Sequence, residues 1–179
     1  MNSVKVNFKN SLKRDVIDSG KCLGCRTCIV ACPFDCLDYK EDKPFLVKEC
    51  NECGICAKAC PQYNWIQQEA EKFVFGRERK PEEEFGIYRK LAIVQATDSQ
   101  ILKVCQDGGA VTALLLFALK EGIIDSAIVT MEDSQKPFYP HPTLATTPQE
   151  ILQSAGTKYF YSPNILALTE AIKQKKSRV

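Results

Sequence analysis

The stretch Cys22-Leu-Gly-Cys25-Arg-Thr-Cys28-Ile-Val-Ala-Cys32-Pro33 is matched, 28 positions later, by Cys50-Asn-Glu-Cys53-Gly-Ile-Cys56-Ala-Lys-Ala-Cys60-Pro61. Both stretches have the spacing C-x2-C-x2-C-x3-C-P, and every cysteine of the first has a counterpart in the second. An internal repeat of this kind indicates a duplicated half-domain. The two stretches therefore predict one small domain built from two related halves.

The cysteine spacing predicts iron–sulfur clusters. Three thiolates spaced C-x2-C-x2-C hold three corners of one [4Fe-4S] cubane, and in two-cluster ferredoxins the fourth cysteine ligates the other cluster. We therefore assign the first cluster to Cys22, Cys25, Cys28 and Cys60, and the second to Cys50, Cys53, Cys56 and Cys32. Zinc is the alternative, but paired zinc sites usually stop at four ligands. The sequence thus predicts an α+β, pseudo-twofold, two-cluster ferredoxin domain over residues 1–68.

The cysteines are concentrated in one part of the chain. Nine of the ten lie between Cys22 and Cys60, and the tenth is Cys105. Such clustering fits metal ligation, because structural disulfides are distributed over a small secreted fold. Cys36 is outside the ligand pattern and is interpreted as a small buried residue, with a substitute ligand or a redox-active thiol as alternatives. We expect a reducing, cytoplasmic location, with peripheral docking on a membrane complex left open.

The charge balance and the apolar runs limit the partners. Lys and Arg number 24 against 22 Asp and Glu, a net charge of +2, which predicts no nucleic-acid partner. The longest apolar run, residues 110–119, is well short of the ~20 residues of a membrane span. We therefore expect no transmembrane segment, and partners that are proteins or small redox molecules.

The composition changes after the cysteine-rich part. Residues 69–90 are strongly charged and contain Gly76, Pro81 and Gly86, which is typical of an exposed linker. Residues 91–179 follow an α/β pattern, with a strand at 91–97, a buried helix at 110–121, a strand at 126–130 and an amphipathic helix at 165–175. The order strand, helix, strand predicts a β–α–β crossover of a parallel sheet. So few elements make an incomplete α/β domain, which a partner chain or a longer polypeptide would complete.

The second half also resembles a known family. The segment that begins Cys105-Gln-Asp-Gly108-Gly109-Ala-Val-Thr112 looks like the N-terminal signature of the coenzyme F420 hydrogenase/dehydrogenase beta-subunit family. Residues 142–152 and 154–159 resemble the family's next stretches, and the family continues beyond them, so residues 91–179 are expected to be a truncated portion. The resemblance implies a flavin, usually FAD, that exchanges a hydride with coenzyme F420 as substrate and passes single electrons to iron–sulfur clusters. Gly108, Gly109 and Thr112 match the signature and are the candidate cofactor-binding residues.

The fusion of the two parts resembles electron-input subunits of F420-linked oxidoreductases, whose partners are other redox subunits of hydrogenase- or dehydrogenase-type complexes. Two alternatives remain open: a non-catalytic ferredoxin-type carrier whose α/β half only docks a partner, and a ferredoxin-dependent flavoprotein reductase. No catalytic residue is assigned. Cys105 is interpreted as a packed small residue, and His141, Lys158 and Tyr159 as surface residues, with an anionic ligand as the alternative at Lys158 and Tyr159.

Overall fold

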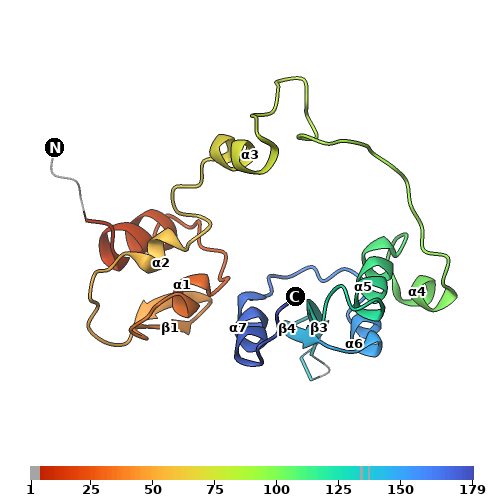
Figure 1. The fold of residues 1–179 in the computed structure, drawn as a ribbon. Coiled ribbons are helices and arrows are strands. Elements are labelled where there is room, and N and C mark those ends of the chain that lie inside the picture. Colours follow the sequence, from red (N-terminus) through yellow and green to blue (C-terminus); the bar gives the residue numbers. More distant parts are fainter. Residues whose placement is uncertain (1–4, 134, 137) are drawn as a thin grey trace.

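The structure, a computed structural model, describes residues 5–133, 135–136 and 138–179. Figure 1 shows an N-terminal unit (residues 5–66), a connector (residues 67–90) and a C-terminal unit (residues 91–179). The elements are, in chain order, η1 Phe8–Ile17, α1 Thr27–Val30, β1 Leu37–Lys40, β2 Lys43–Leu46, α2 Ile55–Lys58, α3 Gln67–Phe75, α4 Ser99–Val104, α5 Ala110–Lys120, β3 Ala127–Glu132, β4 Pro140–Ala145, α6 Pro148–Gln153 and α7 Ile165–Lys173. The fold is mixed α and β, with two small sheets.

The N-terminal unit packs three helices around one antiparallel hairpin. β1 pairs with β2, and the turn residues Glu41 and Asp42 have φ of 50° and 59°, as a two-residue type I′ turn requires. The buried side chains of this unit's apolar core are Phe8, Leu12, Val16, Cys28, Leu37, Cys56 and Ala57. Two of these core residues are predicted cluster ligands. The bound cofactor is therefore expected to supply part of the core itself.

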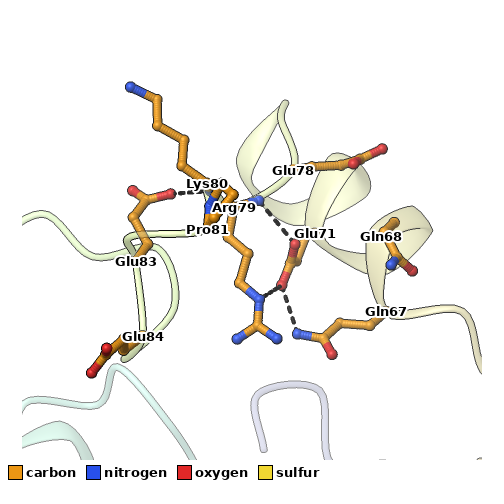
Figure 2. A pocket seen from close by; sticks show the side chains of 9 residues that line it. All are labelled: Gln67, Gln68, Glu71, Glu78, Arg79, Lys80, Pro81, Glu83 and Glu84. Atoms are coloured by element: carbon orange, nitrogen blue, oxygen red, sulfur yellow. Dashed lines mark hydrogen bonds and ion pairs between the residues drawn. The ribbon is translucent and has the colours of Figure 1, made fainter.

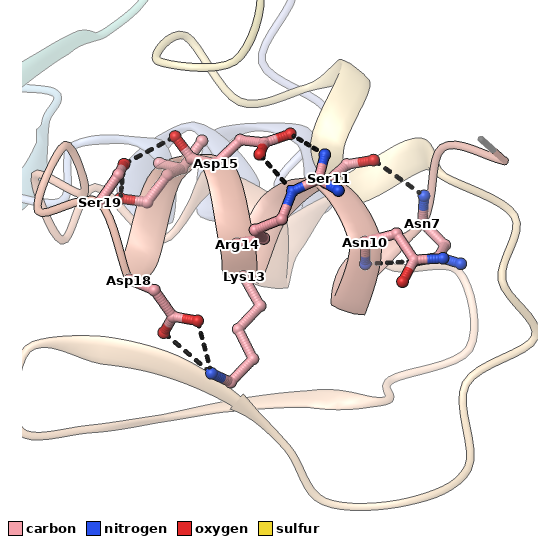
Figure 3. A network of polar contacts seen from close by, with 9 residues as sticks. Asn7, Asn10, Ser11, Lys13, Arg14, Asp15, Asp18 and Ser19 are labelled. Atoms are coloured by element: carbon pink, nitrogen blue, oxygen red, sulfur yellow. Dashed lines mark hydrogen bonds and ion pairs between the residues drawn. The ribbon is translucent and has the colours of Figure 1, made fainter. Parts of the chain in front are cut away.

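The π-helix η1 has one polar and one apolar face. Figure 3 shows the polar contacts: the Asn10 N–H donates to the Asn7 side chain (2.7 Å) at the N-cap, and Lys13 Nζ donates to both carboxylate oxygens of Asp18 (2.9 and 2.8 Å). Phe8, Leu12 and Val16 are buried on the other face, against the cysteine-bearing loops. This division of faces places η1 as a cover over the predicted cluster sites.

The two cysteine stretches repeat in the backbone as well as in the sequence. α1 and α2 each have four residues, begin 28 positions apart, and follow a residue in the left-handed conformation, Arg26 (φ 62°) or Gly54 (φ 75°). In each half the N–H of the fourth cysteine donates to the carbonyl three residues earlier, at 3.1 Å for Cys32 and for Cys60. The same local fold thus presents each set of cysteines.

The connector is organised by ion pairs. α3 ends at Gly76, and the Arg77 guanidinium then donates two hydrogen bonds to the Glu83 carboxylate (2.7 and 2.6 Å). Figure 2 shows Glu71 of α3 accepting from the side chains of Arg79 and Gln67. The two arginines are exposed and the two carboxylates are partly covered, and ion pairs that water can reach contribute only about 0.2–1 kcal/mol each. They fix the local path of the connector and add little to the stability of the whole chain.

The C-terminal unit is built on the antiparallel hairpin of β3 and β4, with Ala127 opposite Ala145. Its core contains Ala127, Val129, Ala145 and Ile151, and Leu115, Leu116 and Leu119 of α5 pack against it. α7 lies on β4, and α6 contacts α5 and both strands. The sequence correctly predicted the helices α5 and α7 and the strand β3.

Three expectations for this unit are wrong. The predicted strand at residues 91–97 is an extended segment without regular structure, because its backbone finds one partner, the hydrogen bond from the Ala96 N–H to the Gly108 carbonyl (2.7 Å). β3 pairs antiparallel with β4, so the described residues contain no parallel β–α–β crossover. The predicted buried helix, α5, has no fully buried residue, and Val111, Leu114 and Phe117 are exposed on the side that faces away from the core.

The N-terminal and C-terminal units touch at α1 and α7. In Figure 1 the hairpin and α1 lie beside α7. A cavity of about 420 Å³ lies at this contact; Cys22, Leu23, Gly24 and Arg26 line it from one side, and Tyr139, His141, Phe160 and Tyr161 from the other. The first cysteine loop therefore faces the C-terminal unit.

Candidate functional site: two thiol-lined cavities and a glycine-edged cavity

The eight predicted ligands fall into two groups in space. Cys22, Cys25 and Cys28 line one cavity together with Cys60, and Leu12 and Val16 of η1 cover it. Cys50, Cys53 and Cys56 line a second cavity together with Cys32, and Phe8 of η1 covers that one. Each half thus contributes three cysteines to one cavity and its fourth cysteine to the other. This is the same grouping as the one predicted from the sequence.

Left-handed residues give the ligand loops their shape. Gly24 (φ 70°) and Arg26 (φ 62°) flank the second cysteine of the first loop, and Glu52 (φ 54°) and Gly54 (φ 75°) flank that of the second. Such residues turn the backbone sharply, so that all three thiols of a loop point to one side. The fourth thiol is brought in by the short helix that follows each loop.

The chemistry of the donor set fits iron–sulfur clusters. Burial, with smaller contributions from neighbouring cysteines, raises the pKa of the Cys28 thiol to about 12 and that of Cys56 to about 11. Thiols packed so closely become thiolates together only when a metal takes up their charge. Eight thiols in two groups, each with three cysteines from one loop and one from the other, are the donor set of a two-cluster ferredoxin, whereas paired zinc sites usually stop at four ligands.

Hydrogen bonds around the cavities are also of the kind that cluster ligands receive. The Cys36 N–H donates to Cys32 Sγ (3.4 Å), and the Glu52 N–H donates to Cys50 Sγ (3.3 Å). Arg26 lines the first cavity, and its Nε is buried without a protein partner. A sulfur atom of a bound cluster would give this N–H donor an acceptor. Arg26 was not among the site residues predicted from the sequence. The signal was the arginine at a left-handed position where the repeat has Gly54.

Cys36 is buried beside the second cavity, and its Sγ lies 3.2 Å from the Glu49 carbonyl, to which it donates. A thiol that donates its S–H to a carbonyl stays protonated, whereas a cluster ligand has to be a thiolate. The interpretation of Cys36 as a small buried residue agrees with this contact.

A larger cavity, of about 600 Å³, lies in the C-terminal unit and brings together the three candidate cofactor-binding residues. Gly108, Gly109 and Thr112 line it, opposite Thr130 and Thr157. Its volume is in the range of small-molecule sites. The structure requires glycine at both positions whether or not a ligand binds. A Cβ on Gly108 would meet the Val94 carbonyl oxygen, and Gly109 has φ 71° at the N-cap of α5.

Several polar groups in or beside this cavity already have hydrogen-bond partners in the protein. Lys158 Nζ donates to the carbonyls of Ser154 (3.0 Å) and Ala155 (2.7 Å), at the end of α6, where a cation is favourable. Cys105 Sγ donates to the Asp107 carbonyl (2.9 Å), and the Tyr159 hydroxyl accepts from Gln106 (2.7 Å). His141 lies outside this cavity, in β4, at the contact between the units. The structure thus groups Gly108, Gly109 and Thr112 and leaves His141 apart.

Within the described residues, no helix combines the length and the apolar character that a bilayer span requires.

Comparison with known proteins agrees with this division. The chain is 34% identical over 198 residues to an uncharacterized protein of Methanocaldococcus jannaschii. The aligned region covers 95% of this chain and 51% of that protein. It is 46% identical over 90 residues to the coenzyme F420 hydrogenase subunit beta of Methanothermobacter thermautotrophicus (50% and 31% covered), and 32% identical over 150 residues to the coenzyme F420-dependent sulfite reductase of M. jannaschii (83% and 21%). The chain therefore spans about half or less of the length of these relatives.

Two families match separate parts of the chain. Residues 21–66 match the 4Fe-4S dicluster domain, and they contain every cysteine of the two thiol-lined cavities. Residues 92–169 match the N-terminal part of the coenzyme F420 hydrogenase/dehydrogenase beta subunit, and they contain the glycine-edged cavity. The chain is thus a 4Fe-4S dicluster ferredoxin domain followed by the N-terminal domain of the coenzyme F420 hydrogenase/dehydrogenase beta-subunit family.

Proposed function

We propose that this chain carries two [4Fe-4S] clusters in a pseudo-twofold ferredoxin domain and passes single electrons between them and a flavin held by its second domain. Cys22, Cys25, Cys28 and Cys60 hold the first cluster, and Cys50, Cys53, Cys56 and Cys32 hold the second. The observation that carries the proposal is the grouping of these eight thiols in two cavities, each with three cysteines from one half and one from the other. The boundaries we propose are residues 1–68, 69–90 and 91–179.

The cross-ligation determines how the clusters communicate. Cys32 and Cys60 each leave one ligand loop on a helix of four residues and enter the other cavity, so that α1 and α2 hold the two sites next to each other. When bound, the clusters supply one-electron redox chemistry. The thiols hold them at a fixed separation, and the apolar side chains of η1 limit water at both sites.

We propose that the 600 Å³ cavity of the C-terminal unit holds the flavin, FAD in most relatives of this kind, and that reduced coenzyme F420 is the hydride donor. Gly108 and Gly109 leave the N-terminus of α5 free of side chains, which suits a phosphate group, and Thr112 adds a hydroxyl one turn later. The named activities of the relatives, an F420 hydrogenase and an F420-dependent sulfite reductase, support this choice of donor. Other redox subunits of such a complex, in the cytoplasm, would be the partners.

The test is the iron and flavin content of anaerobically purified protein, followed by titration with reduced F420. We expect about eight irons and about one flavin per chain. Addition of reduced F420 should then bleach the visible absorbance of the clusters. Full iron with no bleaching after flavin reconstitution would contradict the F420-linked role and leave the electron-transfer role intact.

A non-catalytic carrier is the second candidate. The observation in its favour is that both glycines have a packing role and that Lys158 is already engaged with two carbonyls, so the cavity has fewer free polar groups than a cofactor site usually has. In that case the C-terminal unit only docks a partner. The same measurement separates the two candidates, because a carrier would contain iron but bind no flavin in stoichiometric amount.

A further inference from the structure

The two cluster sites share a backbone but differ in charge. Lys21, just before the first ligand of the first loop, is matched by Glu49 in the second loop. Between the first and second ligands, Gly24 is matched by Glu52. Between the second and third ligands, Arg26 is matched by Gly54. These three differences make the surroundings of the first site more positive, and two others run the opposite way, since Gly20 is matched by Lys48 and Val30 by Lys58. The first stretch still carries the larger net positive charge.

Arg26 is the member of this set that reaches into a site. Its guanidinium carbon lies 4.0 Å from the centroid of the Tyr39 ring, and its Nε is buried with no hydrogen-bond partner in the protein. Arg26 lines the cavity of Cys22, Cys25, Cys28 and Cys60. It also occupies the left-handed region, at φ 62°, which costs energy for a residue other than glycine. A half-buried cation in a strained backbone position, with its Nε–H buried and unused, indicates a ligand on the side of the cluster.

The second site has no room for an equivalent side chain. A Cβ on Gly54 would come within 2.5 Å of the Val6 carbonyl oxygen, because the segment before η1 passes over this loop. Among the described residues that line the second cavity, none is charged. Lys5 pairs with Glu52 at 3.5 Å, but both side chains are more than half exposed, so water screens this cation. The difference between the sites is therefore built into the packing.

We infer that the cluster held by Cys22, Cys25, Cys28 and Cys60 has the higher reduction potential of the two, and that Arg26 sets this order through its charge and its Nε–H. The inference rests on the proposed function, since it requires both clusters. Reduction adds one negative charge to a cubane, and a nearby cation or N–H donor stabilises the reduced form. Backbone N–H groups donate to ligands of both sites and so do not separate them. A guanidinium, with its Nε buried, is present at one site alone among the described residues that line the two cavities.

The cluster with the higher proposed potential is also the one nearer to the C-terminal unit. The cavity of the first cluster and the cavity between the two units share Cys22, Leu23, Gly24 and Arg26 in their linings. An electron shared by the pair therefore rests on the cluster that faces the C-terminal unit. In that step the second cluster is oxidised, the first is reduced, and no proton or further reactant is needed.

The test is a potentiometric titration of the full chain, followed by electron paramagnetic resonance of the reduced clusters. The wild-type protein should show two one-electron waves. Arg26→Gly places in the first loop the residue that the second loop has at this position, Gly54. In this variant the higher wave should move to lower potential by about 59 mV, which is a tenfold change in the ratio of reduced to oxidised cluster. The lower wave should move much less. Arg26→Gln, which keeps N–H donors without the charge, should give an intermediate shift.

Lys21→Gln is the matched control, because it removes the same formal charge from an exposed side chain next to Cys22. It should leave both waves within a small fraction of the Arg26→Gly shift. A single wave in the wild-type protein, an unmoved higher wave in both Arg26 variants, or an equal shift in Lys21→Gln would each overturn the inference. Iron is measured in every sample: fewer than about eight irons in the wild-type protein would count against the proposed function itself.

Discussion

At the scale of the residue, the cysteines of the N-terminal unit have different surroundings although their sequence context is similar. Cys53 is exposed at the mouth of the second cavity, where it completes a set of four thiols. Cys36 lines the same cavity but donates to the Glu49 carbonyl. The two residues therefore offer a direct comparison between a proposed ligand and a packed thiol.

Substitution Cys53→Ala should remove one cluster and leave the other. The iron content should fall from about eight to about four per chain, because each cubane contains four irons and is not retained when one of its four cysteine ligands is missing. Cys36→Ala is the control and should keep about eight irons. Iron and acid-labile sulfide are measured on anaerobically purified protein. Full iron in Cys53→Ala would show that the ligand assignment of the second site is wrong.

Gly108 is required for packing whether or not a flavin binds. Substitution Gly108→Ala should destabilise the C-terminal unit by about 1–3 kcal/mol, because the new methyl group meets the Val94 carbonyl oxygen, which is backbone and cannot turn away. Gly122→Asn should be nearly neutral, because nothing lies near its Cβ position and asparagine tolerates a φ of 65°. Urea unfolding of the full chain measures both. Equal stability of the two variants would contradict the close approach at Gly108.

At the scale of the element, α5 shows why a correct helix prediction still gave the wrong burial. Its sequence is apolar nearly all round, and the usual inference is a helix covered on every side. In the structure Leu115, Leu116 and Leu119 pack on the core of the hairpin, while Val111 and Leu114 are 73% and 68% exposed. The strand expected at residues 91–97 would have extended a sheet that covers the other side of this helix. No described strand pairs with residues 91–97, so that side of α5 stays uncovered.

Leu114 and Leu116 separate the two faces of α5. Leu114→Lys should change the free energy of unfolding by less than about 0.5 kcal/mol and should increase solubility, because the side chain is already exposed. Leu116→Lys should cost at least about 2 kcal/mol, because it places a charge against the apolar core. Thermal unfolding and the concentration at which each variant precipitates give the comparison. A large loss of stability in Leu114→Lys would mean that this face is covered in solution.

The sequence predicted the elements better than their pairing. The spacing of apolar residues predicted α5 and α7, although neither helix has a side-chain hydrogen bond at its N-cap. The repeat of cysteines predicted how eight thiols group in space. The partner of β3 was not predictable, because β4 contains prolines and a histidine that resemble a loop. The role of Arg26 was missed because it depends on a left-handed backbone angle, which the sequence gives only for glycine with any reliability.

At the scale of the whole molecule, the connector determines how far apart the two domains can move. α3 and the ion pairs of Arg77 with Glu83 and of Arg79 with Glu71 shorten the segment between them. Hydrogen bonds from Arg77 lower the pKa of the Glu83 carboxyl to about 2, so this pair stays charged at neutral pH and is lost only in strong acid. The arrangement of the two domains follows from this segment and from the contact of α1 with α7. The sequence predicted a charged linker at residues 69–90 but neither its ion pairs nor the contact of α1 with α7.

Substitution Glu83→Gln should make the connector easier to cleave. Trypsin cuts after Arg77 and Arg79, and the initial rate should rise by about two- to fivefold, which corresponds to the loss of one exposed ion pair. Glu84→Gln removes the same charge from the next residue and serves as the control. Gel analysis of timed digests at neutral pH gives the rates. Equal rates in the two variants would mean that net charge, and not the pair with Arg77, protects the connector.

The small apolar core of the N-terminal unit has a consequence for the life of the protein in the cell. That core counts Cys28 and Cys56 among its buried residues, and four other cysteines of the two sets pack around it. A newly made chain without clusters has too little else to bury, so metal loading and folding become one event. Chains that wait for iron stay open to chaperones and proteases. Iron supply, more than the rate of synthesis, is then what we expect to set how many copies a cell keeps.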